Sequence, residues 1–305
     1  MEIRIATRKS ELALWQAKHV AQKLEGLPQR PDVTLVPLST RGDEILDKSL
    51  QKIGGKGLFI KELEVAMQEG AADIAVHSMK DVPAEMPDGF CIGAVLERAN
   101  PSDAFVSGSE KRFTELAPGS VIGSSSLRRQ AQLKAVRPDI EVTPLRGNVN
   151  TRLRKLEEGL YDAIILASAG LERLGFEQHI TEEFGTDQML PAAAQGVVGI
   201  ECLSDRADLL EILALLEDPV SKLTTAAERA VAATLDANCQ SPVASYAVIE
   251  NDVLTIQALV ASIDGSTIVR ECVSGKPADA YTLGIDVAER LLARGAGDLL
   301  VGENE

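Results

Sequence analysis

The amino-acid sequence predicts an α/β protein, with two lobes in which strands and helices alternate and a smaller α+β domain after them. Two observations carry this prediction. Short apolar runs alternate with segments of helical period along residues 1–216. Residues 243–274 instead hold three runs of alternating pattern, joined by Asn251-Asp252 and Asp264-Gly265, which is typical of an antiparallel meander.

The first lobe begins with the alternation of a strand at Ile3–Ala6. Apolar residues then recur at three- or four-residue steps from Leu14 to Leu24, which predicts a helix with Ser10 as its N-cap. Similar patterns predict strands at residues 33–38, 74–76 and 92–95 and a helix at 58–68. Residues 42–57 contain a glycine cluster and are predicted to form a mobile loop, which we hypothesise to be a lid.

The second lobe follows a linker at Asn100–Asp103. The continuous apolar run Ala163–Ala167 is typical of a strand inside a parallel sheet. Other strands are predicted at residues 104–106, 121–123 and 140–145, and helices at 127–136, after the turn at 146–151, and after 168–170.

The chain returns at Leu190-Pro191, with a strand predicted at 197–202 and a helix at 209–216. We expect this return to rejoin the first lobe. Helices at 224–235 and from Pro277 to about Arg294 accompany the meander. The expected domains are residues 1–98 with 197–216, residues 102–192, and residues 219–305.

Composition argues against several classes of function. The chain lacks the basic and then apolar pattern of a signal peptide, and no apolar run approaches a membrane span, so we expect a cytoplasmic protein without membrane contact. The four cysteines lack CxxC spacing and are interpreted as reduced thiols, while His19, His77 and His179 form no metal-ligand set. Aromatic residues make up only 3% of the chain, which argues against stacking on single-stranded nucleic acid.

The charges are unevenly distributed. The net charge is −15, yet residues 123–155 hold eight Lys and Arg residues against two acids, Asp139 and Glu141. A cationic segment in an acidic protein indicates a small anionic ligand. The repelling remainder of the chain disfavours a polyanion as long as DNA.

One stretch combines a buried strand with a cluster of polar side chains. The apolar run 74–76 is followed by His77, Ser78, Lys80 and Asp81, and Pro83 then ends the element. In an α/β protein this is the carboxyl end of a strand, where ligands bind. Asp81 is therefore a candidate for acid–base chemistry, and the alternative is a solvated loop acid paired with Lys80.

Several cations stand where the helix dipole opposes them. Arg128 and Arg129 fall in the first turn of one predicted helix and Arg152 just inside another, at a cost of about 0.3–1 kcal/mol each at exposed sites. Such a conflict often serves a ligand, and backbone N–H groups with Arg forks suit a carboxylate or phosphate. The alternative is that these side chains fold back onto Asp139 or Glu141.

Cys239 lies on a loop after a predicted helix, and Pro242 prevents that helix from continuing. A thiol on such a loop is more accessible than a core cysteine and can act as a nucleophile. The alternative is a cysteine without a functional role.

Together these stretches resemble the porphobilinogen deaminase (hydroxymethylbilane synthase) family. The resemblance covers nearly the whole chain in the family's order, at residues 4–10 (RIATRKS), 54–59 (GGKGLF), 76–83 (VHSMKDVP), 123–129 (GSSSLRR), 145–149 (LRGNV) and 191–196 (PAAAQG). One departure is that Ala237-Asn238 precede the cysteine, where the family commonly has two glycines. Asn tolerates a left-handed backbone better than Ala does, so the turn geometry at this point is open.

The resemblance implies three domains, the first two being lobes with mixed sheets like those of a periplasmic binding protein, with an active cleft between them. It implies a dipyrromethane cofactor joined to Cys239 by a thioether, onto which four porphobilinogen molecules are condensed with loss of ammonia. It also implies a monomer.

Site residues follow by the same resemblance. Asp81 is the catalytic carboxylate. The cofactor is bound by Lys80, Ser78, Ser124, Ser126, Arg128 and Arg129. Porphobilinogen and the intermediates are bound by Arg8, Ser10, Lys52, Lys56, Phe59, Arg146, Arg152, Arg173 and Gln195.

Two other classes of function compete with this interpretation. A two-lobed solute-binding protein without catalysis has no need for Cys239 or a third domain. A nucleic-acid binder using the cationic segment is disfavoured by the net charge and the scarcity of aromatic residues.

Overall fold

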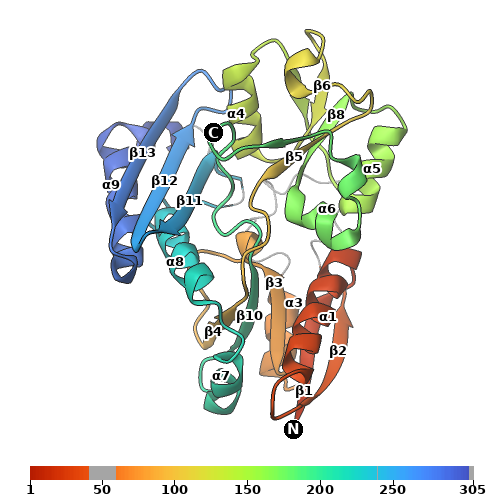
Figure 1. Ribbon diagram of the computed structural model, residues 1–305, viewed down its shortest axis with the longest axis vertical. Coiled ribbons are helices and arrows are strands. Elements are labelled where there is room, and N and C mark those ends of the chain that lie inside the picture. The colour runs from red at the N-terminus through yellow and green to blue at the C-terminus, as the bar shows by residue number, and fades with distance from the viewer. Residues whose placement is uncertain (41–59, 239, 302–305) are drawn as a thin grey trace. The chain divides into compact units, whose positions relative to one another are not determined.

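The computed structural model describes residues 1–40, 60–238 and 240–301 of the chain (Figure 1). Two compact units are formed, one by residues 1–99 with 197–222 and the other by residues 100–196 with 223–305. Both units are discontinuous in sequence because the chain leaves the first unit and later returns to it. The three predicted domain boundaries stay a prediction.

The first unit is built on a mixed five-stranded sheet in the order β2-β1-β3-β10-β4. Its strands are β1 (Glu2–Arg8), β2 (Asp32–Leu38), β3 (Ile74–Ser78), β4 (Phe90–Val95) and β10 (Val198–Leu203). Strands β1, β2 and β3 are parallel. Strand β10 runs antiparallel between β3 and β4, so a segment from much later in the chain fills the middle of this sheet.

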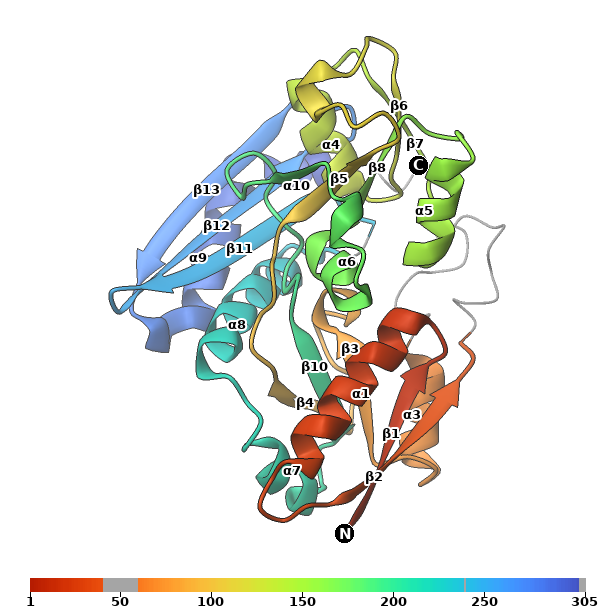
Figure 2. The same cartoon turned by 45° about the vertical axis from the view of Figure 1, so that its right-hand side comes forward.

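Helices cover both faces of this sheet, and successive side chains of its strands point to opposite faces. Ile3 and Ile5 pack with α1 (Glu11–Glu25) and α7 (Ala207–Leu213), whereas Ala6 and Ala75 pack with α3 (Lys61–Gln68). Helix α1 lies along β1 and β2 (Figure 2). It begins as the sequence predicts, because the Ser10 hydroxyl accepts a hydrogen bond from the Ala13 N–H at 3.4 Å.

The second unit contains a mixed five-stranded sheet in the order β7-β6-β8-β5-β9. Its strands are β5 (Asp103–Ser107), β6 (Val121–Gly123), β7 (Glu141–Thr143), β8 (Ala163–Ala167) and β9 (Glu182–Phe184). Strands β6, β7 and β8 are parallel, and β5 is antiparallel to both β8 and β9. Helix α4 (Leu127–Val136) packs on one face, and α5 (Val149–Glu157) and α6 (Ser168–Leu174) pack on the other.

The same unit holds an antiparallel three-stranded sheet of β11 (Val243–Glu250), β12 (Val253–Ala261) and β13 (Ile268–Gly275). Helices α8 (Pro219–Thr234), α9 (Ala280–Ala293) and α10 (Ala296–Val301) accompany it. The hairpin between β12 and β13 touches α4 at Gly265, where a β-carbon would overlap the backbone of Ala131 and Ala135. Gly265 also has a φ of +72°, so only glycine suits this contact.

The prediction of an α/β fold with mixed sheets is confirmed, and most predicted elements are present. The run 163–167 is a central strand, but its neighbours are one parallel and one antiparallel strand rather than parallel strands only. Strand β7 is shorter than the predicted 140–145, since Pro144 cannot donate to a ladder. The last predicted helix ends at Ala293 and is followed by α10, which the sequence analysis does not predict.

Neither a membrane nor a metal site is indicated by the described residues. None of their helices is both long and apolar enough to cross a membrane. No three or more of their His, Cys, Asp and Glu side chains gather where they could hold a metal ion. The predicted loop at residues 42–57 lies outside the described residues.

Candidate functional site

The first candidate site lies at the edge of the first unit's sheet where β1 and β3 end. Arg8 is the last residue of β1 and Ser78 the last of β3. A 3₁₀ turn, η2 (Met79–Asp81), follows β3 directly. Because the carboxyl ends of parallel strands meet at one edge of a sheet, Arg8 and Asp81 belong to the same edge. Ser10 follows Arg8 and serves as the N-cap of α1.

Asp81 is exposed on this turn, which we call the Asp81 turn. Its carboxylate forms no hydrogen bond or ion pair with any residue that the structure describes, so it is not paired with Lys80. Lys80 is partly exposed beside it. The two residues therefore present a carboxylate and an ammonium group on adjacent positions of one short turn.

The Asp81 turn is held from within the first unit. Ser78 Oγ accepts a hydrogen bond from Gln16 Nε2 of α1 at 2.8 Å. The Met79 N–H donates to the Val197 carbonyl at 3.0 Å. The buried Met79 side chain also fills the space beside Gly199 of β10, where any β-carbon would overlap Met79 Sδ.

A buried ionisable pair lies immediately before the turn. His77 Nε2 and Glu201 Oε2 are 2.7 Å apart, and both side chains are buried. Glu201 Oε1 has no hydrogen-bond partner among the described residues. Burial, followed by the charge of Glu201, raises the pKa of Glu64 on α3. This pair links β3 to β10 directly before the polar residues of the Asp81 turn.

The second candidate site lies at the edge where β6, β7 and β8 end. Ser124 follows β6, Arg146 follows β7, and Arg173 lies in α6 after β8. Strand β5 runs in the opposite direction and pairs its first residue, Asp103, with Ala167 at the end of β8. Asp103 consequently lies at the same edge as the other three.

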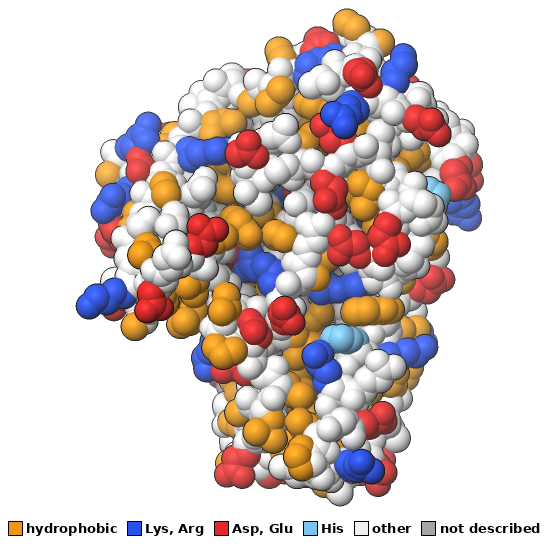
Figure 3. Space-filling view, in the orientation of Figure 1, with side chains coloured by type: hydrophobic (Ala, Val, Ile, Leu, Met, Phe, Trp, Pro, Cys, Tyr) orange, Lys and Arg blue, Asp and Glu red, His pale blue; other side chains and the backbone are white. Residues whose placement is uncertain are grey.

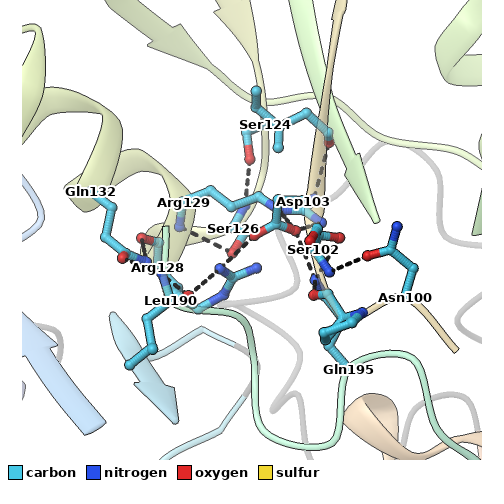
Figure 4. A network of polar contacts seen from close by, with 12 residues as sticks. Asn100, Ser102, Asp103, Ser124, Ser126, Arg128, Arg129, Gln132, Leu190 and Gln195 are labelled. Atoms are coloured by element: carbon cyan, nitrogen blue, oxygen red, sulfur yellow. Dashed lines mark hydrogen bonds and ion pairs between the residues drawn. The ribbon is translucent and has the colours of Figure 1, made fainter. Parts of the chain in front are cut away.

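Asp103, Arg128 and Arg129 form a buried cluster at this edge, which we call the arginine centre (Figure 4). Arg128 Nη1 donates to Asp103 Oδ2 at 2.7 Å, and Arg129 Nη2 and Nε donate to Asp103 Oδ1 at 2.6 and 3.0 Å. The exposed fractions are 0% for Asp103, 4% for Arg128 and 6% for Arg129. One carboxylate thus serves two guanidinium groups.

Backbone and amide groups complete the arginine centre. Arg128 Nη1 also donates to the Leu190 carbonyl at 2.7 Å, and Arg129 Nη1 donates to the Ile165 carbonyl at 3.0 Å. Gln195 Nε2 donates to Asp103 Oδ1 at 3.0 Å. Figure 4 shows Arg128 and Arg129 of α4 and the amide of Gln195 converging on Asp103 of β5.

The two serines expected at the cofactor site shape the start of α4. Ser126 is its N-cap and accepts from the Arg129 N–H at 3.4 Å, and the Ser126 N–H in turn donates to Ser124 Oγ at 3.2 Å. The side chains of Arg128 and Arg129 therefore project from the first turn of a helix whose N-terminus is held by hydrogen bonds.

Electrostatics at the arginine centre are set by burial and by the shortage of negative charge. Burial alone raises the pKa of Asp103, but the adjacent Arg128 and Arg129 guanidinium groups hold it well below its usual range. Burial lowers the pKa of Arg128, although Asp103 offsets part of this effect. With all three groups ionised, the centre carries one surplus positive charge.

This arrangement rules out the alternative that the sequence analysis left open for these two arginines. Arg128 and Arg129 do not fold back onto Asp139 or Glu141, because Asp139 pairs with Arg137 at 2.7 Å and Asp103 takes both arginines. Asp103 was expected only in a linker. The sequence does place Asp103 just before an apolar strand. It does not give the direction of that strand, and so it does not show which side chains Asp103 meets.

The remaining predicted arginines of the second site, Arg146, Arg152 and Arg173, are partly exposed. Arg152 Nε donates to the Gly147 carbonyl at 2.7 Å, and Arg173 Nη2 donates to the Gly196 carbonyl at 2.7 Å. Burial lowers the pKa of Arg173. The Arg146 carbonyl accepts from Lys155 Nζ at 3.1 Å. These contacts hold the guanidinium groups of Arg152 and Arg173 and the backbone of Arg146 near the ends of β7 and β8.

Cys239, Lys52, Lys56 and Phe59 lie outside the described residues. The residues before Cys239 resolve the question of backbone strain. Ala237 has no positive φ, and the left-handed residue is Asp236, at +46°. Asn238 Oδ1 accepts from the Gln240 N–H at 2.7 Å, so its side chain supports the turn.

Two family models match the chain. One, described as porphobilinogen deaminase, dipyromethane cofactor binding domain, matches residues 3–211, and the other, porphobilinogen deaminase, C-terminal domain, matches residues 222–293. A curated relative, the porphobilinogen deaminase of Chromobacterium violaceum, is 52% identical over 300 residues, which are 98% of this chain and 97% of the relative.

Solved structures show a weaker likeness. The periplasmic aliphatic sulphonate binding protein SsuA from Escherichia coli is 14% identical, with a TM-score of 0.42 over 77% of this chain and 70% of its own. An ABC transporter from Parabacteroides distasonis is 13% identical, with a TM-score of 0.43 over 75% of this chain and 73% of its own. Likeness at this level bears on neither ligand nor reaction.

Proposed function

The chain belongs to the porphobilinogen deaminase family, and from this premise we propose a role for each side chain at its two sites. Its reaction condenses four porphobilinogen molecules head to tail on a dipyrromethane primer, losing ammonia at each step, and hydrolysis then releases hydroxymethylbilane. Every ring carries an acetate and a propionate, so the growing chain gathers carboxylates. The observation that carries our assignment of roles is the arginine centre, with its surplus positive charge.

The arginine centre suits the carboxylates of the primer. A buried surplus charge is costly, and a carboxylate that arrives beside it removes that cost. Arg128 and Arg129 hold the primer together with Ser124 and Ser126 at the start of α4. Ser78 and Lys80 of the first site contribute to the same task. Each charge-assisted hydrogen bond contributes about 1.5–3 kcal/mol.

Cys239 attaches the primer covalently through its sulfur, as a thioether. When bound, the cofactor supplies the nucleophilic pyrrole carbon to which the first substrate is joined. A thiol is suited to this role because the thioether forms once and persists through every later addition.

Asp81 is the catalytic carboxylate. It is exposed next to Lys80 and remains unpaired with any described residue, so it is free to approach a cation on the substrate. An ionised carboxylate stabilises the positive charge that develops on porphobilinogen as ammonia leaves. The same carboxylate can then take the proton that the pyrrole carbon loses after the new carbon–carbon bond has formed.

Substrate and intermediates are held by the remaining cations. Arg146, Arg152 and Arg173 bind the carboxylates of incoming rings at the ends of β7 and β8, with Gln195 near them. Arg8 and Ser10 serve at the first site. Lys52, Lys56 and Phe59 complete this set by the family match alone.

Intact mass tests the proposal directly. The purified protein should exceed its sequence mass by one two-ring adduct, and Cys239→Ala should match its sequence mass and turn over no porphobilinogen. Cys272→Ala is the control, because this exposed cysteine belongs to neither site. An adduct that survives in Cys239→Ala would show that another residue carries the primer.

We also propose that the enzyme is a cytoplasmic monomer. This part rests on family membership and on the sequence pattern. Light scattering that gives a mass near 32.5 kDa supports it, and a mass of twice that value contradicts it.

A further inference from the structure

The arginine centre holds two cations against one anion, all nearly inaccessible to solvent. A structural ion pair needs no second cation, and a buried charge without a partner disfavours folding. The surplus charge therefore points to a ligand. It also makes Asp103 the one carboxylate that decides how the two guanidinium groups are oriented before that ligand arrives.

The hydrogen bonds divide the donors of Arg128 into two groups. A guanidinium has five N–H donors. Both donors on Arg128 Nη1 are used, one by Asp103 Oδ2 and one by the Leu190 carbonyl. Its Nε and Nη2 groups bind no acceptor among the described residues. Asp103 thus fixes one side of this fork and leaves the other side open to a further acceptor.

Asp103 is itself held rigidly. As the first residue of β5 it pairs with Ala167 of β8 and with Phe184 of β9, so its backbone is fixed on both sides. Gln195 Nε2 donates to Oδ1 and so restrains the carboxylate as well. A carboxylate held in this way can transmit its position to both arginines.

We propose that Asp103 is a positioning residue for the cofactor, which holds Arg128 and Arg129 together as one anion-binding unit and leaves the outer donors of Arg128 for a cofactor carboxylate. The inference rests on the proposed function, in which these two arginines bind the primer. Asp103 itself touches neither cofactor nor substrate in this role.

The decisive variant keeps the negative charge of residue 103 but changes the position of its carboxylate. Asp103→Glu retains one negative charge but displaces the carboxylate by one methylene group, so the two guanidinium groups lose their common orientation. Asp139→Asn is the matched control, because Asp139 also binds an arginine, Arg137, in the same unit but away from the arginine centre. Each protein is prepared without cofactor, from cells that cannot make porphobilinogen.

The first measurement is the rate at which these proteins acquire the two-ring adduct when porphobilinogen is added, followed by intact mass. Wild type and Asp139→Asn should load at equal rates, whereas Asp103→Glu should load at least tenfold more slowly. Equal loading of Asp103→Glu and wild type would overturn the role of Asp103 and leave the proposed function standing. A wild-type protein that never gains the adduct would overturn the proposed function itself.

The second measurement needs no catalysis and uses citrate as a polycarboxylate probe. Citrate should raise the Tm of the cofactor-free wild type, and this rise should be at least halved in Asp103→Glu. Asp103→Asn should start from a lower Tm but show a larger rise than wild type, because its centre carries one more surplus charge. Equal rises in all three proteins would mean that Asp103 has only a structural role.

Discussion

Two aspartates show how residues of one type serve different purposes in this chain. Asp81 is exposed and unpaired with any described residue, so its negative charge is available to a substrate. Asp103 is fully buried and its charge is used by two arginines. The sequence predicts the first, because polar residues directly follow an apolar run. It does not predict the second, because an acid before a strand reveals its partners only when the direction of that strand is known.

Asp81→Asn should lower kcat by about 100- to 1000-fold, because the amide can neither stabilise a cation nor accept the proton. Its fold should be unchanged, since Asp81 contacts no described partner. Steady-state kinetics and circular dichroism check both statements. Asp88→Asn, an exposed acid further along the same chain segment, should behave as wild type. Near-normal turnover by Asp81→Asn would refute the assignment.

Asp103 should make the stability of the protein depend on pH in a defined direction. Its pKa is lowered in the folded state, so its ion pairs contribute above the unfolded pKa of about 3.9, and this contribution is lost as the pH falls below it. Asp103→Asn should cost about 3–5 kcal/mol of unfolding free energy at neutral pH. In urea titrations, this difference should stay constant from pH 8 to 5 and shrink below pH 4. A difference that instead grows with acidity would contradict the sign.

At the scale of elements, strand ends bring the functional residues together. Strong periodicity predicts nearly every helix and strand that positions them, including α4 at its observed bounds. The strand β9 is not predicted, because its residues, Glu182-Glu183-Phe184, show neither an apolar run nor an alternation. The sequence analysis expects β10 in the first lobe, but its position between β3 and β4 and the direction of β5 are not predictable, since both depend on partners distant in sequence.

Through the contact between Gly199 and Met79, strand β10 supports the Asp81 turn. Gly199→Ala should push Met79 outward and displace Asp81, so we expect kcat to fall at least tenfold with a smaller change in KM. Gly108→Ala is the control, because its φ is not positive and a β-carbon there meets only ordinary contacts. Partial recovery in Gly199→Ala/Met79→Ala would identify the overlap as the cause. A kcat of Gly199→Ala equal to that of wild type would show that the turn tolerates displacement.

At the scale of the whole molecule, cationic sites coexist with a strongly acidic chain. Acidic and basic side chains are interspersed on the face shown in Figure 3, and the buried arginine centre contributes little to it. Composition alone predicts the preference for a small anion over a polyanion. The identity of the ligand comes instead from the order of motifs along nearly the full length, which family membership confirms.

The cysteines offer a check on the intact protein. If Cys239 carries the primer, the unfolded holoenzyme should titrate only Cys91, Cys202 and Cys272, one thiol fewer than the cofactor-free chain. In the native state Cys272 should react first, because it is exposed. Cys202 should react slowest, since burial, assisted by Cys91, raises its pKa to about 12. A full complement of four thiols in the unfolded holoenzyme would contradict the thioether.

Strand β10 also has a consequence for how the protein is made. It occupies the middle of the first unit's sheet, between β3 and β4, yet it belongs to a segment that begins after residue 196. While the ribosome is still extending the chain through residues 100–196, β3 and β4 have no strand to join them. The first 99 residues therefore cannot complete their sheet until β10 has been synthesised. A fragment that ends at residue 99 should not fold alone.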